Sequence, residues 1–190
     1  MRAFIAIDLP KEIKDYLSLL EAKLKQSGAD VKWVAPVNIH LTLKFLGEID
    51  EQKTNKITQI LEEISFRTPQ YHLKLGDIGA FPNIKSPRII WIGLAAGDNE
   101  TKEIATNLEE KIEKIGIPKE DKPFASHITI GRIKSNLNRE KLTQALTALT
   151  TENDKAIYQF LATKLTLFKS TLTPQGPIYE AVKESSLKTA

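Results

Sequence analysis

The chain has 190 residues, of which 41% are apolar, and a formal net charge of +3; this size suits one globular unit, which can still be two-lobed. The absence of cysteine excludes disulfides, thiolate metal sites and a cysteine nucleophile. There is no 18-residue apolar span, and the start reaches Asp8 and Pro10 too early for a signal peptide, so we expect a soluble, cytoplasmic protein. The mild basicity suits an anionic ligand but not a general electrostatic binder of nucleic acids.

The first half of the chain alternates between strand and helix patterns. Residues 3–8 read as a short buried strand, and apolar residues at helical spacing follow them. Strand patterns return at 31–34 and at 39–45, and the second of these alternates apolar and polar residues. A second amphipathic helix is predicted next, with Asp50 as its N-terminal cap.

The second half repeats these patterns. Gly79, Pro82 and Pro87 predict a loop region between its first two strands. One helix is expected after Asp98, and a fourth is expected around Leu146. The predicted strands of this half are 71–75, 88–94, 126–130, 160–172 and 177–182.

Two of the three histidines begin the same kind of tetrapeptide, His-x-Thr-x with apolar residues at x, at His40 and at His127. Because side chains alternate along a strand, each histidine shares a face with the threonine two residues later, Thr42 or Thr129. The third histidine, His72, lacks a following threonine, and we interpret it as a surface residue. The repeated tetrapeptide therefore predicts a site that uses His40 and His127 together.

Each half thus contains a strand, a helix, a His-x-Thr-x strand and a second helix, and we infer an internal duplication. The predicted fold class is α/β (α+β): bilobal, with two antiparallel-rich β-sheets, outer helices, pseudo-twofold symmetry and a central cleft between the lobes. We expect residues 1–184 to form one bilobal domain. Residues 185–190 are expected to be a disordered or marginal C-terminal tail.

Two imidazoles and two hydroxyls facing one cleft suit a phosphate ester. Threonine hydroxyls can donate to non-bridging oxygens, while one imidazole takes a proton from water and the other protonates a leaving oxygen. An ordinary histidine pKa near 6.5 suits both roles near neutral pH. No metal site is expected, because zinc needs three or four protein ligands and neither cysteine nor His-x-Glu-x-x-His is present. Phosphate-binding Gly-rich loops and a Gly-x-Ser-x-Gly elbow are also missing from the sequence.

Two further residues near the motifs are candidates for contact with the substrate. Arg132 is the preferred cation for forked contact with phosphate oxygens, although strict alternation puts it on the face opposite His127 unless the strand ends or twists. Phe45 is a candidate for stacking on a base at the rim of the cleft. Its alternation with Leu41 and Leu43 favours a place in the core instead.

The paired tetrapeptides resemble the two-histidine (2H) phosphoesterase superfamily, and specifically the RNA 2',3'-cyclic phosphodiesterases, also called 2'-5' RNA ligases. The likeness spans nearly the whole chain. Beyond the two motifs it rests on residues 1–7, 32–34, 45–47, 81–83, 87–88, 91–93, 167–170 and 176–179.

The resemblance implies the bilobal fold and hydrolysis of terminal 2',3'-cyclic phosphates to 2'-phosphates, with no metal or other cofactor. It implies His40 as proton donor and His127 as proton acceptor, with Thr42, Thr129 and Arg132 as phosphate-binding residues. The expected partner is RNA with a 2',3'-cyclic phosphate end, bound by a monomer away from any membrane. Reverse 2'-5' ligation, a small cyclic nucleotide or ADP-ribose cyclic phosphate as substrate, and a non-catalytic RNA-end binding module remain open alternatives.

Overall fold

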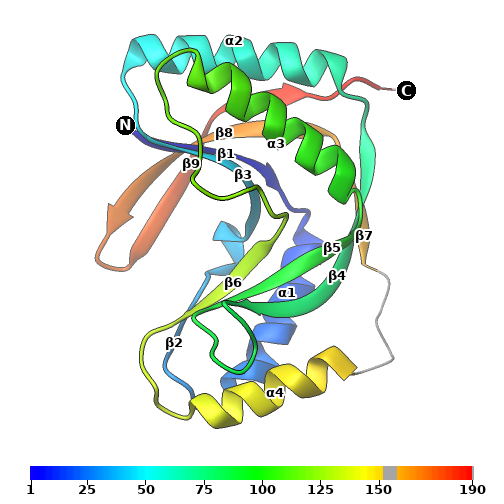
Figure 1. The fold of residues 1–190 in the computed structure, drawn as a ribbon, viewed down its shortest axis with the longest axis vertical. Helices are drawn as coiled ribbons and strands as arrows, with labels where there is room; N and C mark the ends of the chain where they lie inside the picture. Colours follow the sequence, from blue (N-terminus) through cyan, green and yellow to red (C-terminus); the bar gives the residue numbers. More distant parts are fainter. Residues whose placement is uncertain (152–157, 190) are drawn as a thin grey trace.

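The computed structural model describes residues 1–151 and 158–189, which form two antiparallel sheets with helices outside them (Figure 1). The strands are β1 (Arg2–Asp8), β2 (Val31–Trp33), β3 (His40–Glu48), β4 (Tyr71–Phe81), β5 (Ile89–Ala96), β6 (Ile128–Ile133), β7 (Gln159–Ala162), β8 (Lys164–Thr173) and β9 (Gly176–Ser186). The helices are α1 (Lys11–Lys25), the short 3-10 helix η1 (Pro36–Asn38), α2 (Glu51–Arg67), α3 (Asp98–Glu113) and α4 (Arg139–Thr151).

Sheet A has the strand order β3-β1-β8-β9, and sheet B has the order β2-β6-β5-β4-β7. All neighbouring strands are antiparallel. The chain starts in sheet A with β1, enters sheet B at β2 and returns to sheet A at β3. It then builds β4 to β7 in sheet B and ends in sheet A. The predicted bilobal, antiparallel fold is confirmed.

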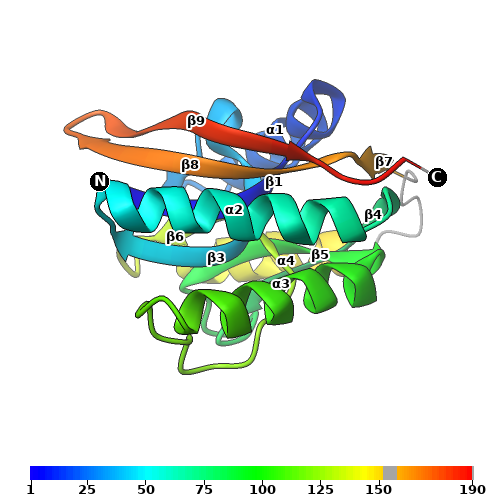
Figure 2. The ribbon, with the colours of Figure 1, turned by 90° about the horizontal axis from the view of Figure 1, so that it is seen from above.

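The helices form where apolar residues recur every three or four positions, and each buries that stripe against a sheet. In α2 the stripe is Ile57, Leu61 and Ile64, and the Asp50 carboxylate accepts a hydrogen bond from the Lys53 amide at 2.7 Å, which confirms the predicted cap. Helices α2 and α3 run side by side at one end of the molecule, while α1 and α4 lie at the other (Figures 1 and 2). None of the helices in the described part of the chain is long and apolar enough to cross a membrane.

Several boundaries differ from the sequence prediction, and the strand expected over 160–172 is two strands, β7 in sheet B and β8 in sheet A. β4 continues to Phe81, so Gly79 lies in a strand and not in a loop; a Cβ there would lie 2.4 Å from the ring of Trp91, and the glycine makes room for that ring. β6 begins at Ile128, two residues later than expected. The prediction of a disordered tail is wrong for the residues described: β9 runs to Ser186, and Leu187 is only 2% exposed. Ala190 lies outside the described residues.

Candidate active site

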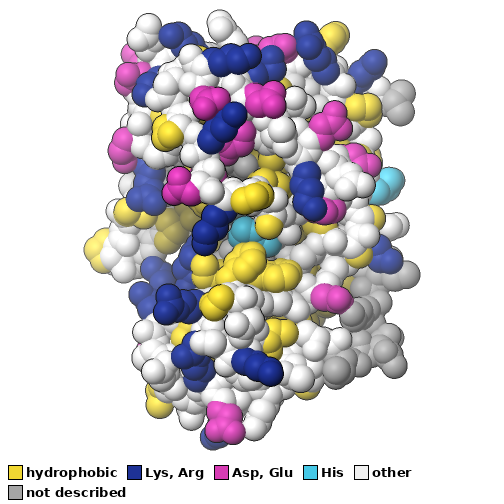
Figure 3. All heavy atoms as spheres, in the orientation of Figure 1, with side chains coloured by type: hydrophobic (Ala, Val, Ile, Leu, Met, Phe, Trp, Pro, Cys, Tyr) yellow, Lys and Arg dark blue, Asp and Glu magenta, His cyan; other side chains and the backbone are white. Residues whose placement is uncertain are grey.

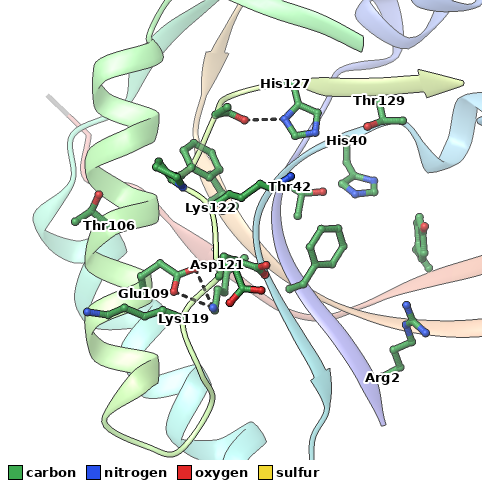
Figure 4. Close-up of a pocket in the computed structure, with 18 of the residues that line it drawn as sticks. Arg2, His40, Thr42, Thr106, Glu109, Lys119, Asp121, Lys122, His127 and Thr129 are labelled. Carbon is green, nitrogen blue, oxygen red and sulfur yellow. Dashed lines mark hydrogen bonds and ion pairs between the residues drawn. The ribbon is translucent and has the colours of Figure 1, made fainter. Parts of the chain in front are cut away.

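A cavity of about 780 Å³ lies where the two sheets meet. His40 is the first residue of β3 in sheet A, and His127 directly precedes β6 in sheet B. Figure 3 shows histidine side chains at the centre of this face, surrounded by apolar side chains, and Figure 4 shows both imidazoles from inside the pocket. The cavity is lined by all six residues that the sequence singled out: His40, Thr42, Phe45, His127, Thr129 and Arg132.

The two imidazoles are held by equivalent hydrogen bonds. His40 Nδ1 lies 2.7 Å from the carbonyl oxygen of Asn38, and His127 Nδ1 lies 2.7 Å from that of Ala125, two residues upstream in each case. A carbonyl can only accept, so each Nδ1 must carry a hydrogen. The neutral form of each ring then has a free lone pair on Nε2, which can take a proton, and the cationic form can donate that proton back.

Aromatic rings fix the planes of both histidines. Phe4 of β1 stacks on His40 with 4.7 Å between ring centroids, and Tyr179 of β9 meets it edge-on at 5.4 Å. Phe81 of β4 meets the His127 ring edge-on at 5.2 Å. The hydrogen bond and the aromatic packing together restrict each ring, so the two Nε2 atoms are preorganised.

The two histidine strands share an irregularity that their sequences do not reveal. Opposite β3, the register of β1 shifts between Ile5 and Ala6, which leaves Leu43 as an extra residue. Opposite β6, the register of β5 shifts between Ile90 and Trp91, which leaves Ile130 as the extra residue. Each bulge residue is therefore the fourth position of its His-x-Thr-x tetrapeptide, and each reverses the alternation that follows it.

This reversal decides where Phe45 and Arg132 point. Phe45 pairs with Phe4, the residue under His40, and is 55% exposed at the cavity, so the expectation of a core position is wrong. Arg132 pairs with Ile89, and Thr129 pairs with Trp91. Because Ile89 and Trp91 are two residues apart on β5, their partners Arg132 and Thr129 face the same side, and both line the cavity. The difficulty that strict alternation raised for Arg132 is removed by the bulge. Both residues stand five positions after their histidine.

The sequence matches a known protein family along most of its length. The LigT like Phosphoesterase family fits two consecutive segments, residues 7–91 and 92–179. The chain belongs to this family. The two adjoining matches, each containing one His-x-Thr-x tetrapeptide, also agree with the internal duplication inferred from the sequence.

Individual LigT-like relatives align with almost the entire chain. A protein of Methanocaldococcus jannaschii named RNA 2',3'-cyclic phosphodiesterase is 40% identical over 184 residues, which cover 97% of this chain and 99% of the relative. An Aquifex aeolicus protein of the same name is 37% identical, and the alignment covers 97% of this chain and 96% of the relative. Among solved structures, E. coli LigT complexed with 3'-AMP superposes with a TM-score of 0.79 at 27% identity, covering 98% of this chain and 97% of that one.

In this LigT-like site, burial affects the acid–base behaviour of His40. Burial lowers the pKa of His40 below its ordinary value of 6.5, because desolvation disfavours the imidazolium. The hydrogen bond to the Asn38 carbonyl and the nearby Asp8 carboxylate oppose this effect, and Lys14 adds to it. His72, in contrast, is exposed on β4 and is not among the cavity residues, as the sequence predicted.

The two threonine hydroxyls and two cavity residues that the sequence analysis gave no role complete the site. Among the described residues, the hydroxyls of Thr42 and Thr129 have no hydrogen-bond partner, so both can donate to a ligand. Arg2 and Tyr179 also line the cavity. Burial raises the pKa of Tyr179, and the positive charges of Arg132 and Arg2, which line the same cavity, lower it.

A buried ion pair joins the two halves beside the cavity. Lys44 of β3 is 2% exposed, and its ammonium donates to both carboxylate oxygens of Glu109 in α3, at 2.8 and 2.9 Å. Its third hydrogen bond goes to the Pro118 carbonyl at 2.8 Å, in the connection that leads to His127.

Within the described residues, no group of three or more His, Asp or Glu side chains is arranged to hold a metal ion. The cavity lining instead offers imidazole, hydroxyl and guanidinium side chains. Their arrangement suits in-line displacement at a phosphorus atom placed between the two histidines.

Proposed function

We propose that the protein hydrolyses 2',3'-cyclic phosphate ends of RNA to 2'-phosphates, with His40 and His127 as the acid and base. The observation that carries this proposal is the matched pair of Nδ1 hydrogen bonds, which leaves both Nε2 atoms to act in one cavity. Relatives of this chain that are named RNA 2',3'-cyclic phosphodiesterase support the choice of substrate. The two imidazoles supply both proton transfers, so the proposed reaction needs no metal ion.

In the proposed reaction, His127 Nε2 takes a proton from water as the water oxygen forms a bond to phosphorus. The bond from phosphorus to the 3'-oxygen breaks in line, and His40 Nε2 donates its proton to that oxygen. The phosphate stays on the 2'-oxygen. His40 ends neutral and His127 ends cationic, and proton exchange with solvent restores the starting forms.

Hydrogen-bond donors around the phosphate stabilise the charge that develops in the transition state. The hydroxyls of Thr42 and Thr129 donate to non-bridging oxygens, and the guanidinium of Arg132 provides a forked, charge-assisted contact. The exposed ring of Phe45 offers a stacking surface for the terminal base. These assignments place one phosphate at the centre of the cavity and one base at its rim.

The role of His40 as proton donor requires the imidazolium form, which burial disfavours in the free protein. An anionic cyclic phosphate beside the ring reverses this effect, because an opposite charge raises a histidine pKa. Substrate binding and protonation of His40 are therefore coupled. By microscopic reversibility, a 5'-hydroxyl in the place of water gives 2'-5' ligation, which hydrolysis outcompetes in dilute solution.

The test is turnover of an oligoribonucleotide ending in 2',3'-cyclic phosphate, in EDTA, by wild type, His40→Ala, His127→Ala and His72→Ala. His72 is the matched control, because it is a surface histidine outside the cavity. We expect a 2'-phosphate product from wild type and His72→Ala, and a loss of at least about a hundredfold in the other two variants. Circular dichroism establishes that each variant is folded.

Three results would contradict the proposal. No turnover by wild type, with retained affinity for the RNA end, would indicate a binding module. Turnover that survives either cavity substitution would remove the two-histidine mechanism. Activity confined to small cyclic nucleotides would change the substrate class.

A further inference from the structure

Two cations stand side by side at the outer edge of sheet B. Lys32 of β2 and Arg132 of β6 are direct cross-strand partners in the antiparallel pairing, so their side chains project from the same face of the sheet. That face is the one toward the cavity, because the bulge at Ile130 returns Arg132 to the side of Thr129. Lys32 itself is exposed and lies beyond the cavity lining.

Like charges directly opposite each other destabilise a sheet unless something neutralises them. Neither Lys32 nor Arg132 forms a salt bridge with a carboxylate within the described part of the chain. The neighbours of Lys32 in β2, Val31 and Trp33, pack against the core from the other face. The Lys32 side chain therefore extends from the exposed face, directly across the strand pair from a second cationic residue. An anionic ligand bound there would relieve the repulsion.

The charges on the cavity walls indicate which way a polyanion leaves the site. Figure 4 shows Arg2 on one side of the pocket and Glu109 and Asp121 on the other. In Figure 3, Lys and Arg side chains gather beside the central histidines on the flank where Figure 1 places β2 and the β8–β9 hairpin. The wall formed by α3 and the connection to β6 carries both signs, with more acids than bases: Glu109, Glu110, Glu120, Asp121, Lys119 and Lys122.

We propose that Lys32, next to Arg132 at the β2–β6 edge, binds the phosphodiester that precedes the terminal nucleotide of an RNA substrate. This inference rests on the proposed function, which places the terminal phosphate between the histidines and within reach of Arg132. Adjacent strands lie about 5 Å apart, so Lys32 stands one strand farther from the histidines than Arg132. This spacing is comparable to the step from one phosphate to the next along a nucleotide chain.

The proposal makes Lys32 a specificity residue that acts only on substrates longer than one nucleotide. A 2',3'-cyclic mononucleotide has no preceding phosphodiester and does not reach Lys32. An oligonucleotide does reach it, and each phosphate neutralised by a cation steepens the salt dependence of binding by about 0.7 in the logarithmic slope for single strands. The site therefore distinguishes an RNA end from a free cyclic nucleotide by charge alone.

The experiment compares wild type, Lys32→Gln and Lys32→Arg on two substrates that share a terminal base, a cyclic mononucleotide and an oligonucleotide. Lys56→Gln is the control, because Lys56 is exposed on α2 and its substitution changes the net charge equally. We expect Lys32→Gln to lower kcat/KM about fivefold on the oligonucleotide only, through KM. Lys32→Arg should retain wild-type values, and the salt slope for the oligonucleotide should fall by about 0.7 in Lys32→Gln.

Equal effects of Lys32→Gln on both substrates, or an effect no larger than that of Lys56→Gln, would overturn the subsite. If wild type turns over neither substrate, the proposed function fails. The subsite is then tested separately, by measuring binding affinity. Fluorescence anisotropy with an oligonucleotide and a mononucleotide, both ending in 2'-phosphate, then measures the same preference. Loss of oligonucleotide affinity alone in Lys32→Gln would support the subsite, and unchanged affinity would refute it.

Discussion

Removing Glu109 should destabilise the protein more than removing its partner Lys44. The side chain of Lys44 is 1% exposed and that of Glu109 is 18% exposed. Glu109→Leu leaves a buried ammonium with only the Pro118 carbonyl as acceptor, and breaking a buried pair in this way costs about 3–5 kcal/mol. Lys44→Met leaves a partly exposed carboxylate that water can solvate, so we expect this substitution to lower the free energy of unfolding by about 1–3 kcal/mol.

The double variant Lys44→Met/Glu109→Leu is the informative control. Two apolar side chains replace the pair, no charge is left buried, and the total cost should be smaller than the sum of the single costs by at least about 1 kcal/mol. Equilibrium urea unfolding at pH 7, followed by both tryptophan fluorescence and circular dichroism, measures all four free energies. The reasoning is refuted if Glu109→Leu costs no more than Lys44→Met, or if the two single costs simply add.

Three further outcomes concern titration and base binding. In an NMR titration of the free protein, the pKa of His40 should lie below 6.5, and Asp8→Asn should lower it further. A bound nucleoside 2'-phosphate should raise this pKa. An unchanged pKa on binding would contradict the proposed coupling. Burial raises the pKa of Glu21 from 4.5 to about 7, so its contribution to stability is complete below pH 4.5 and is lost as pH rises to 7. The free energy of unfolding of the wild type should therefore fall by up to about 3 kcal/mol between pH 5 and pH 8 because of Glu21, and Glu21→Gln should remove this part of the fall. Identical pH dependence in both proteins would count against the prediction. Phe45→Ala should lower kcat/KM about 5- to 150-fold, which corresponds to about 1–3 kcal/mol of lost base stacking, without lowering Tm. Equal activity of the variant would show that no base stacks there.

Sequence periodicity predicted the helices and most strands because each element buries one face. The helix α2 is the clearest case, since both its cap, Asp50, and its buried apolar stripe can be recognised in the sequence. Gly79 was misread because a glycine in sequence looks like a turn signal, whereas here it makes room for the Trp91 ring. Leu187 was misread because a single apolar residue near the end of a polar segment carries no periodicity.

The histidine pair was predictable because two of only three histidines open the same tetrapeptide. The directions of Phe45 and Arg132 were not, because a bulge becomes visible only in the register with the partner strand. The Lys44–Glu109 contact joins residues 65 positions apart, and nothing in either local sequence marks a buried charge. The cross-strand position of Lys32 likewise follows from pairing between distant segments.

The path of the chain between the sheets constrains how the active site can move. The chain passes from one sheet to the other four times, between β1 and β2, β2 and β3, β3 and β4, and β7 and β8. A protein whose lobes are joined by one linker can open around a single hinge, but here all four connections would have to bend together. Neither half of the duplication contains a complete sheet. We therefore expect that the two halves neither fold independently nor move as separate rigid bodies. We therefore expect the separation of His40 and His127 to change little when a substrate binds.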